Sequence, residues 1–267
     1  MEILHYQFMQ RALIAGLAVG FICSFISVFI VLRNLPFLGV GISHSAFGGI
    51  ALGALVGANP TITATLFALA AGTGIAFLHK HGRINEDVSV GIFFSAAMAS
   101  GIAFTGFIKN YQYNLFGYLF GDILSVTSRD LWLTGIIAVL GGALLIRYSA
   151  EPLSIAFNEE LARTSGIAVD RINYGFLALV ALVVVVSIKV VGIILVSALL
   201  VIPAAAAQQL TSNYRRFILI SLGVGLLSNL GGLYLSYAFN LASGAAIVLC
   251  ATILFLTAFL YSNLIRS

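Results

Sequence analysis

Long apolar runs separated by short polar breaks make up most of this 267-residue chain. Most runs approach the roughly 20 residues that a helix needs to cross the hydrocarbon core of a bilayer, and the breaks contain glycine, proline and charged residues. The pattern therefore predicts nine membrane-spanning helices. Their expected ranges are 12–32, 37–57, 61–78, 88–108, 131–146, 172–188, 190–209, 216–238 and 244–262.

One further apolar run, 115–126, is too short for a full span and is expected to be re-entrant or interfacial. The expected fold is an all-α polytopic membrane protein with eight or nine spanning helices, organised as a single transmembrane domain over 1–267. Composition supports this class, because 61% of the residues are hydrophobic and 8% are charged, whereas a soluble domain carries about a quarter charged residues.

The basic residues predict the orientation. With the N-terminus outside and 115–126 not crossing, nine of the 13 Lys and Arg residues fall on the cytoplasmic side, as the positive-inside rule requires. The net charge of +4 then reflects orientation, and no nucleic-acid partner is expected. The cytoplasmic set is Arg33, Lys80, Arg83, Arg147, Arg163, Arg171, Arg215, Arg216 and Arg266, and the external set is Arg11, Lys109, Arg129 and Lys189.

The cytoplasmic segment 147–171 is unusually rich in charge and predicts a short helix within 152–166. The residues that suit its ends are Asn158 as the N-cap, Glu159 and Glu160 in the first turn, and Gly166 after the last turn.

Phe157 and Leu161 are four residues apart in this segment, so they are expected to share a helical face that docks on a partner protein. The alternative is an amphipathic helix lying on lipid headgroups. The nearly balanced charge of the segment argues against that alternative, because surface-seeking helices are rich in Lys and Arg.

The residues present disfavour several ways of driving transport or catalysis. A Walker A motif needs Gly-Lys followed by Ser or Thr, but the residues before the three lysines are His79, Ile108 and Ile188, so the chain is not expected to hydrolyse ATP. Ion-coupled carriers place Asp or Glu inside spans, whereas here the acidic residues lie at span edges or in loops, with Asp122 the nearest exception. No Ser/His/Asp or His-Glu-x-x-His pattern appears.

His44 is an ionisable side chain inside the apolar run 36–57. Such side chains are costly at membrane depth and usually face a pathway or a packed interior. At 1.5 Å per residue, His44 is expected roughly 12 Å along its helix. A neutral imidazole binds divalent metals through one nitrogen while a second group holds the other, and Ser43 or Ser45 can be that group. The alternative is that His44 only hydrogen-bonds between helices.

Small residues and one proline indicate close packing and a helix break. Gly49, Gly53 and Gly57 form a small-xxx-small series that allows helices to approach closely; lining the pore wall is the alternative. Pro203 is expected to kink its helix, and such breaks often line cavities.

Several motifs, in order along nearly the whole chain, resemble one family. They are Val31-Leu-Arg-Asn-Leu-Pro-Phe-Leu-Gly39, the Ser43-His44 pair with its following glycines, Gly82-Arg-Ile-Asn-Glu-Asp-Val-Ser-Val-Gly91, Tyr118-Leu-Phe-Gly-Asp-Ile-Leu124, Glu159-Glu-Leu-Ala-Arg-Thr-Ser-Gly166, Val191-Gly-Ile-Ile-Leu-Val-Ser-Ala-Leu-Leu-Val-Ile-Pro-Ala-Ala204 and Gly232-Leu-Tyr-Leu-Ser-Tyr237. The chain resembles the permease subunits of zinc and manganese ABC importers, the ABC-3 permease family.

The resemblance implies a homodimeric permease in a prokaryotic inner membrane, with a cytoplasmic ATPase and an extracytoplasmic metal-binding protein as partners. Zinc or manganese is then the cargo, and no permanently bound cofactor is expected. His44 of each copy would lie in the metal pathway, although Val40 occupies the position where the family carries Asp. A permease for a metal chelate and a stand-alone metal carrier or channel are the alternatives.

The resemblance also makes the segment 150–167 the coupling helix that contacts the ATPase. The residues expected at that contact are Phe157, Glu159, Glu160, Leu161, Arg163 and Gly166.

Overall fold

A computed structural model of the chain describes residues 7–82, 84–108, 115–121, 126–239 and 241–266. Within these ranges the regular structure is entirely helical. The helices are α1 (Gln7–Leu32), α2 (Leu38–Val56), α3 (Pro60–His81), α4 (Glu86–Phe107), α5 (Leu115–Phe120), α6 (Ser128–Arg147), α7 (Ala150–Phe157), α8 (Glu159–Thr164), α9 (Val169–Val191), α10 (Ile193–Leu199), α11 (Ile202–Leu210), α12 (Tyr214–Phe239) and α13 (Ser243–Arg266).

Nine stretches of the described chain are long and apolar enough to cross a membrane, which confirms the predicted all-α polytopic fold. In the described part of the run 115–126 the helix is the six-residue α5, which is too short to span, as expected. Asp122, which the sequence had singled out, lies outside the described residues.

The span expected as one helix over 190–209 consists of two helices. Gly192, with φ +84°, separates it from α9, and a break between Leu199 and Ile202 divides it into α10 and α11. Pro203 lies in the first turn of α11, where its missing amide hydrogen costs nothing.

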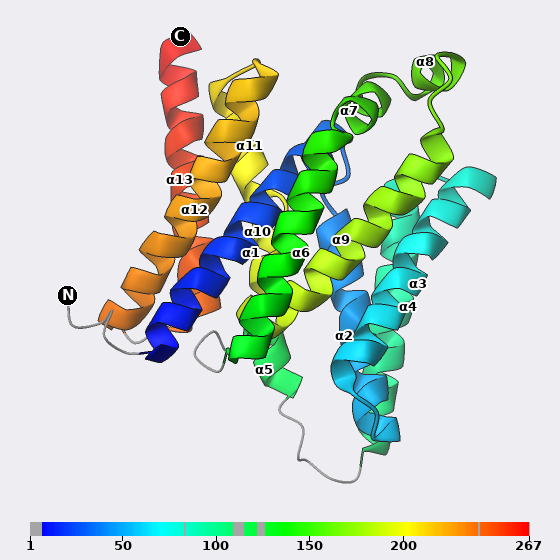
Figure 1. Cartoon of the computed structure of the whole chain (residues 1–267), viewed down its shortest axis with the longest axis vertical. Helices are drawn as coiled ribbons and strands as arrows, with labels where there is room; N and C mark the ends of the chain where they lie inside the picture. Colours follow the sequence, from blue (N-terminus) through cyan, green and yellow to red (C-terminus); the bar gives the residue numbers. More distant parts are fainter. Residues whose placement is uncertain (1–6, 83, 109–114, 122–125, 240, 267) are drawn as a thin grey trace.

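Successive spans run in opposite directions, so the loops alternate between two ends of the molecule (Figure 1). The turn between α3 and α4, the helices α7 and α8 and the end of α13 lie at one end, and the start of α1 and α5 lie at the other. The expected cytoplasmic cations that lie in the described ranges are in or beside the terminal turns of helices at the first of these ends, which we call the cytoplasmic end. Arg83 lies outside those ranges.

The opposite, external end contains an ion pair between two spans. Lys189 Nζ at the end of α9 lies 2.5 Å from Asp130 Oδ1 on α6. The same Asp130 completes a capping box with Thr127 at the start of α6. Its carboxylate therefore accepts hydrogen bonds from both the Lys189 ammonium and the backbone amide of Thr127.

The core is formed by α1 together with α9 and α10. The side chains of Ile22, Ile26 and Phe29 on α1 are almost fully buried, and Phe29 makes an edge-on contact with Phe176 of α9 at 6.4 Å between ring centroids. A helix that is apolar on all sides belongs in such an interior. The outer helices α6 and α13 instead expose large apolar side chains, as helices facing lipid do.

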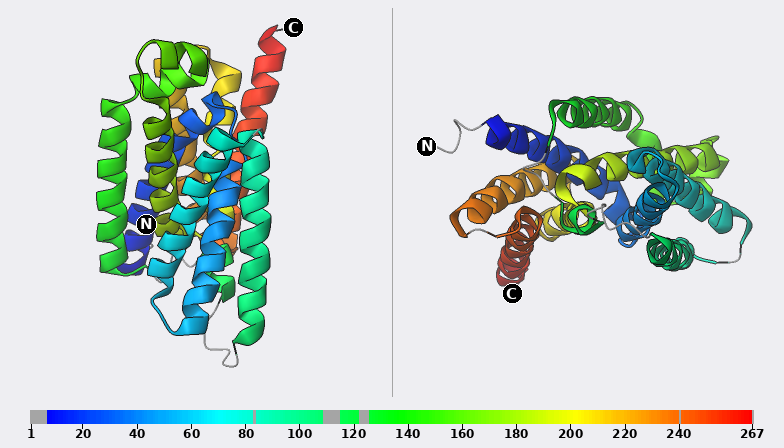
Figure 2. Two further views of the ribbon diagram at one scale, coloured as in Figure 1. Left: turned by 90° about the vertical axis from the view of Figure 1, so that its right-hand side faces the viewer. Right: turned by 90° about the horizontal axis from the view of Figure 1, so that it is seen from below.

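Helix α2 lies between α3 and α4 (Figure 2), and glycines make this close approach possible. A Cβ added at Gly49 would lie 2.5 Å from the carbonyl oxygen of Thr63, and one at Gly53 would lie 3.0 Å from Cα of Pro60. The predicted packing role of Gly57 is wrong. This residue ends α2 in the left-handed conformation at φ +69°, and its added Cβ would meet nothing within 4 Å.

We expect Gly49→Ala to lower the thermal stability of the purified protein. The new methyl group would collide with backbone atoms of α3, which cannot move aside as a side chain can, and overpacking of this kind costs about 1–3 kcal/mol. Gly91→Ala on α4 is the matched control, because a Cβ there meets nothing within 4 Å. Melting curves in detergent should show a lower midpoint for Gly49→Ala alone; equal midpoints would contradict the close packing.

Candidate functional site

His44 lies in the second turn of α2, near the cytoplasmic end of that helix. It is six residues after Leu38, which places it roughly 9 Å along the helix axis. This depth is less than the predicted 12 Å, because the turn after α1 delays the start of α2 to Leu38. The imidazole is partly exposed, whereas Ser43 and Ser45 on either side are buried.

The imidazole of His44 is held by the backbone of its own helix. Its Nδ1 lies 2.9 Å from the carbonyl oxygen of Val40. A carbonyl oxygen can only accept a hydrogen bond, so Nδ1 carries the hydrogen and the neutral ring presents the lone pair of Nε2. A neutral histidine in this tautomer can bind a metal ion through Nε2. Position 40 therefore supports the imidazole through its carbonyl group, whichever side chain it bears.

Ser43 connects the imidazole to a second span. Its Oγ lies 3.4 Å from Nδ1 of His44 and 2.9 Å from Oγ of Ser197 on α10. Ser45 does not have the predicted supporting role: its hydroxyl donates to the carbonyl of Gly41 at 2.7 Å, on another side of α2. The serine on α10 was missed because no local pattern relates positions 154 residues apart.

Phe94 of α4 fixes the other side of the imidazole. The ring centroids of His44 and Phe94 lie 5.0 Å apart with their planes at 72°, an edge-to-face arrangement. Elsewhere in the described residues, no three His, Cys, Asp or Glu side chains converge in a way that could hold a metal ion. His44 is thus a single strong ligand in a small polar patch of hydroxyl and carbonyl oxygens.

The coupling segment is two short helices where one was predicted. Asn158 has extended backbone angles that end α7, and its Oδ1 accepts the amide of Leu161 at 2.9 Å to cap α8. Phe157 and Leu161 consequently lie on different helices, so the face expected from their spacing is wrong. Both side chains are nevertheless exposed, by 79% and 65%.

A small hydrophobic cluster attaches this segment to the membrane body. Ile155 of α7, Ala162 of α8 and Val169 of α9 are buried together, and Ile167 and Ile172 pack against them. Gly166 adopts φ +85° in the turn before α9. The two exposed apolar side chains therefore project from a base that is fixed to α9.

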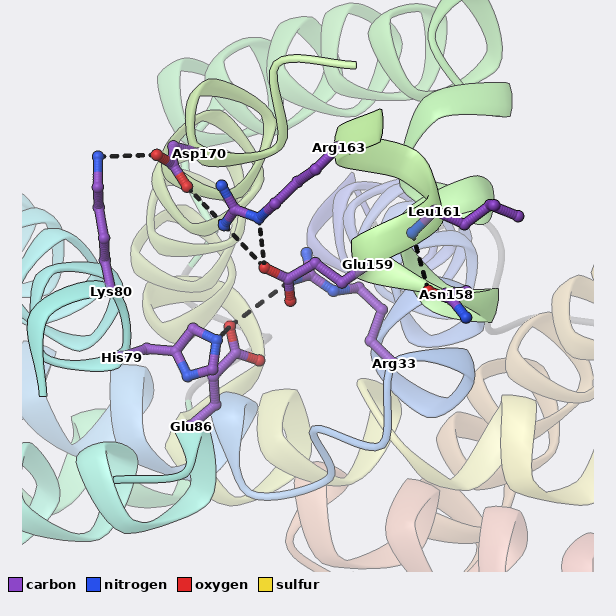
Figure 3. A network of polar contacts seen from close by, with 9 residues as sticks. All are labelled: Arg33, His79, Lys80, Glu86, Asn158, Glu159, Leu161, Arg163 and Asp170. Atoms are coloured by element: carbon purple, nitrogen blue, oxygen red, sulfur yellow. Dashed lines mark hydrogen bonds and ion pairs between the residues drawn. The ribbon is translucent and has the colours of Figure 1, made fainter. Parts of the chain in front are cut away.

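An ion-pair network joins the coupling segment to the ends of the spans (Figure 3). Arg163 of α8 donates through Nη2 to Glu159 and to Asp170, each at 2.8 Å, and Lys80 of α3 lies 2.7 Å from Asp170. These hydrogen bonds raise the pKa of Arg163. The network links α8, α9 and α3 through charged groups. Which of these groups pair with one another cannot be predicted from a sequence pattern.

A second group of charges lies beside it at the start of α4. Glu86 Oε1 lies 3.6 Å from Arg33 Nη2 and 3.9 Å from His79 Nε2. Arg33 is buried against the ring of Phe176 at 5.3 Å, and this burial lowers its pKa while the carboxylates of Glu86 and Glu159 oppose the shift. Members of both groups line one cavity of about 400 Å³, namely Lys80, Glu86, Glu159, Arg163 and Asp170.

Residues 5–262 match the ABC 3 transport family. The chain belongs to this family. It is 41% identical to the manganese transport system membrane protein MntC of Listeria monocytogenes over 97% of this chain and 92% of the relative. It is 35% identical to the manganese import system permease protein ScaB of Streptococcus parasanguinis over 95% of this chain and 90% of the relative.

A solved structure shares the fold of this ABC 3 family member. PsaBC from Streptococcus pneumoniae in complex with Fab superposes with a TM-score of 0.84 at 33% identity, covering 96% of this chain and 92% of that one. The chain is thus a multi-pass membrane permease of an ABC transporter, and in such transporters an ATPase is a separate partner. The α7–α8 segment, with Phe157 and Leu161 exposed, lies at the cytoplasmic end of this permease.

We expect Lys80→Glu to reduce transport while leaving the permease folded. Lys80 and Asp170 are 43% and 30% exposed, and ion pairs of this kind contribute about 0–1 kcal/mol to stability. The loss should therefore appear in uptake rather than in membrane abundance, because the change removes the ion pair between Lys80 of α3 and Asp170 of α9 while the packing of these helices remains. The measurement is the uptake of the transported cargo by cells, divided by the amount of permease in their membranes.

Two companion variants make this measurement decisive. Lys80→Arg keeps the charge and should retain uptake, and Lys80→Gln, which removes the charge without reversing it, should lose less uptake than Lys80→Glu. Full uptake by Lys80→Glu alone would show that the network does not take part in transport.

Proposed function

We propose that this ABC 3 family permease carries a divalent transition-metal cation into the cytoplasm, manganese ahead of zinc, past His44. The observation that carries the proposal is the orientation of the imidazole, whose Nδ1 is bound by the Val40 carbonyl so that Nε2 is free for a metal. The family and the manganese systems named for its relatives supply the class of cargo.

The surroundings of His44 favour manganese over zinc. The oxygens of Ser43 and Val40 lie at Nδ1 and orient the ring, so the other ligands of a cation on Nε2 would be water or groups of a second copy. The two cysteines lie on other spans: Cys23 of α1 contacts Ser187, and Cys250 belongs to α13. Oxygen ligands suit Mn²⁺, whereas zinc sites in proteins prefer nitrogen and sulfur.

One imidazole per chain leaves most of the coordination sphere to other donors. We propose a homodimer, in which His44 of a second copy and water complete a weak site. Weak coordination suits transport, because a cation that binds in the pathway must also leave it. An extracytoplasmic metal-binding protein would deliver the cation, and the ATPase would drive the change of access by moving the α7–α8 segment.

The direct test replaces His44 with Gln in permease reconstituted with its ATPase and metal-binding protein in liposomes. Loss of the nitrogen ligand should reduce ATP-dependent ⁵⁴Mn uptake by at least about tenfold. His81→Gln is the matched control, because this exposed histidine ends α3 and its ring nitrogen bonds only its own helix. If the His44→Gln permease takes up Mn²⁺ at the wild-type rate, His44 has only a structural role. If uptake occurs without the ATPase, the permease is not part of an ATP-driven importer.

Val40→Asp tests the contribution of position 40. A carboxylate one turn before His44 would lie on the same helical face and add a second ligand, which is negatively charged. We expect a lower apparent Km for Mn²⁺ together with a lower maximal rate, because tighter coordination slows release. Competition curves with Mn²⁺ and Zn²⁺ measure both effects; an unchanged Km would show that this face does not contact the cation.

A further inference from the structure

The end of α6, the helix α7 and the start of α9 lie together at the cytoplasmic end (Figure 1). A groove opens between them. Its volume is about 230 Å³. Apolar side chains form most of its walls, namely Leu144 and Leu145 of α6, Pro152 of α7, and Ile172, Phe176 and Leu179 of α9. The groove therefore crosses the level at which two membrane spans give way to the cytoplasmic segment.

The lower part of the groove continues into a surface that faces the hydrocarbon. Val139, Leu140 and Leu144 of α6 are 69%, 64% and 48% exposed. Gly175 of α9 also lines the groove and leaves room in it, because a Cβ there meets nothing within 4 Å. An acyl chain lying along α6 can enter this recess without leaving an apolar environment.

The upper rim of the groove is cationic. Arg171 lines it, and the guanidinium of Arg147 lies over the ring of Tyr148, another lining residue, at 5.5 Å. Neither arginine forms a salt bridge with an acidic side chain in the part of the chain that the structure describes. Arg171 and Glu151 are the charged residues of the lining and balance each other, so Arg147, which lies over Tyr148, leaves the rim with an excess of one positive charge.

We propose that this groove binds one anionic phospholipid of the cytoplasmic leaflet. The phosphodiester would lie between Arg147 and Arg171, and one acyl chain would fill the recess beside Gly175. A single negative phosphodiester matches the excess charge of the rim, and basic pockets between spans on the cytoplasmic side bind anionic headgroups in this way. Tyr148 lies at the level of the headgroups, where amphipathic rings are stable.

The bound lipid would stabilise the coupling segment. The groove is bounded by α6, α7 and α9, and α7 shares its buried Ile155 with the cluster that fixes α8. A lipid filling the groove would hold α7 against both spans. Anionic phospholipid is therefore expected to raise the thermal stability of the permease, independently of what the permease transports.

The test uses the full-length permease, delipidated in detergent and titrated with phosphatidylglycerol or phosphatidylcholine. Native mass spectrometry counts the bound lipid, and thermal melting reports stabilisation. Wild type should bind one phosphatidylglycerol at least tenfold more tightly than phosphatidylcholine. Each arginine near an anionic lipid contributes about fivefold in affinity, so Arg147→Gln with Arg171→Gln should weaken phosphatidylglycerol binding about 25-fold.

Two matched controls separate the site from general charge and from folding. Arg215→Gln with Arg216→Gln removes the same charge from exposed residues at the same end of the molecule, and it should bind as wild type does. Gly175→Leu should block the recess, whereas Gly106→Leu, also at an open helical position, should not. The charge-retaining pair Arg147→Lys and Arg171→Lys should bind phosphatidylglycerol and melt as wild type does.

Three results would overturn the proposal. Wild type that binds both lipids equally has no headgroup site, and equal losses in both Arg-to-Gln pairs would show only general charge attraction. If Gly175→Leu instead separates a permease dimer, the groove is a contact between copies. Each result leaves the transport proposal at His44 unaffected, because none of these variants lies on α2.

Discussion

Every backbone amide and carbonyl at membrane depth needs a partner within the protein, because the hydrocarbon core supplies no water. This constraint explains why the described chain is helical, and it also limits where a helix can break. The break between α10 and α11 is covered by protein, since Leu199 and Leu200 are fully buried. Leu200 lies against Gly39 at the start of α2, so the irregular backbone is adjacent to the helix that carries His44.

The close contacts of α2 connect the candidate pathway to the cytoplasmic end. Its glycines bring it against α3 and α4, and Ser43 joins it to α10. The cytoplasmic ends of α3 and α4 carry Lys80 and Glu86, which belong to the charged groups around the cavity beside α8. A displacement of α8 can therefore reach the helix bearing His44 through ion pairs and packed helices.

The sequence was sufficient for the spans, the short segment after 115 and the Asn158 cap, because hydropathy and local hydrogen bonding decide those features. The sequence did not predict that Asn158 also ends α7 and so places Phe157 and Leu161 on different helices. Contacts between distant positions, such as Lys80 with Asp170 or Ser43 with Ser197, leave no periodic signal in one sequence. Gly57 was misassigned because spacing alone does not distinguish a glycine that packs between helices from one that ends a helix.

The central claim is that the cargo binds Nε2 of His44 on its way through the permease. Pulsed electron paramagnetic resonance can test it on tag-free permease assembled with its ATPase and loaded with Mn²⁺. The account predicts a hyperfine coupling from an imidazole ¹⁴N that disappears in His44→Gln. A spectrum showing only oxygen ligands, or the same nitrogen coupling in the His44→Gln variant, would contradict it.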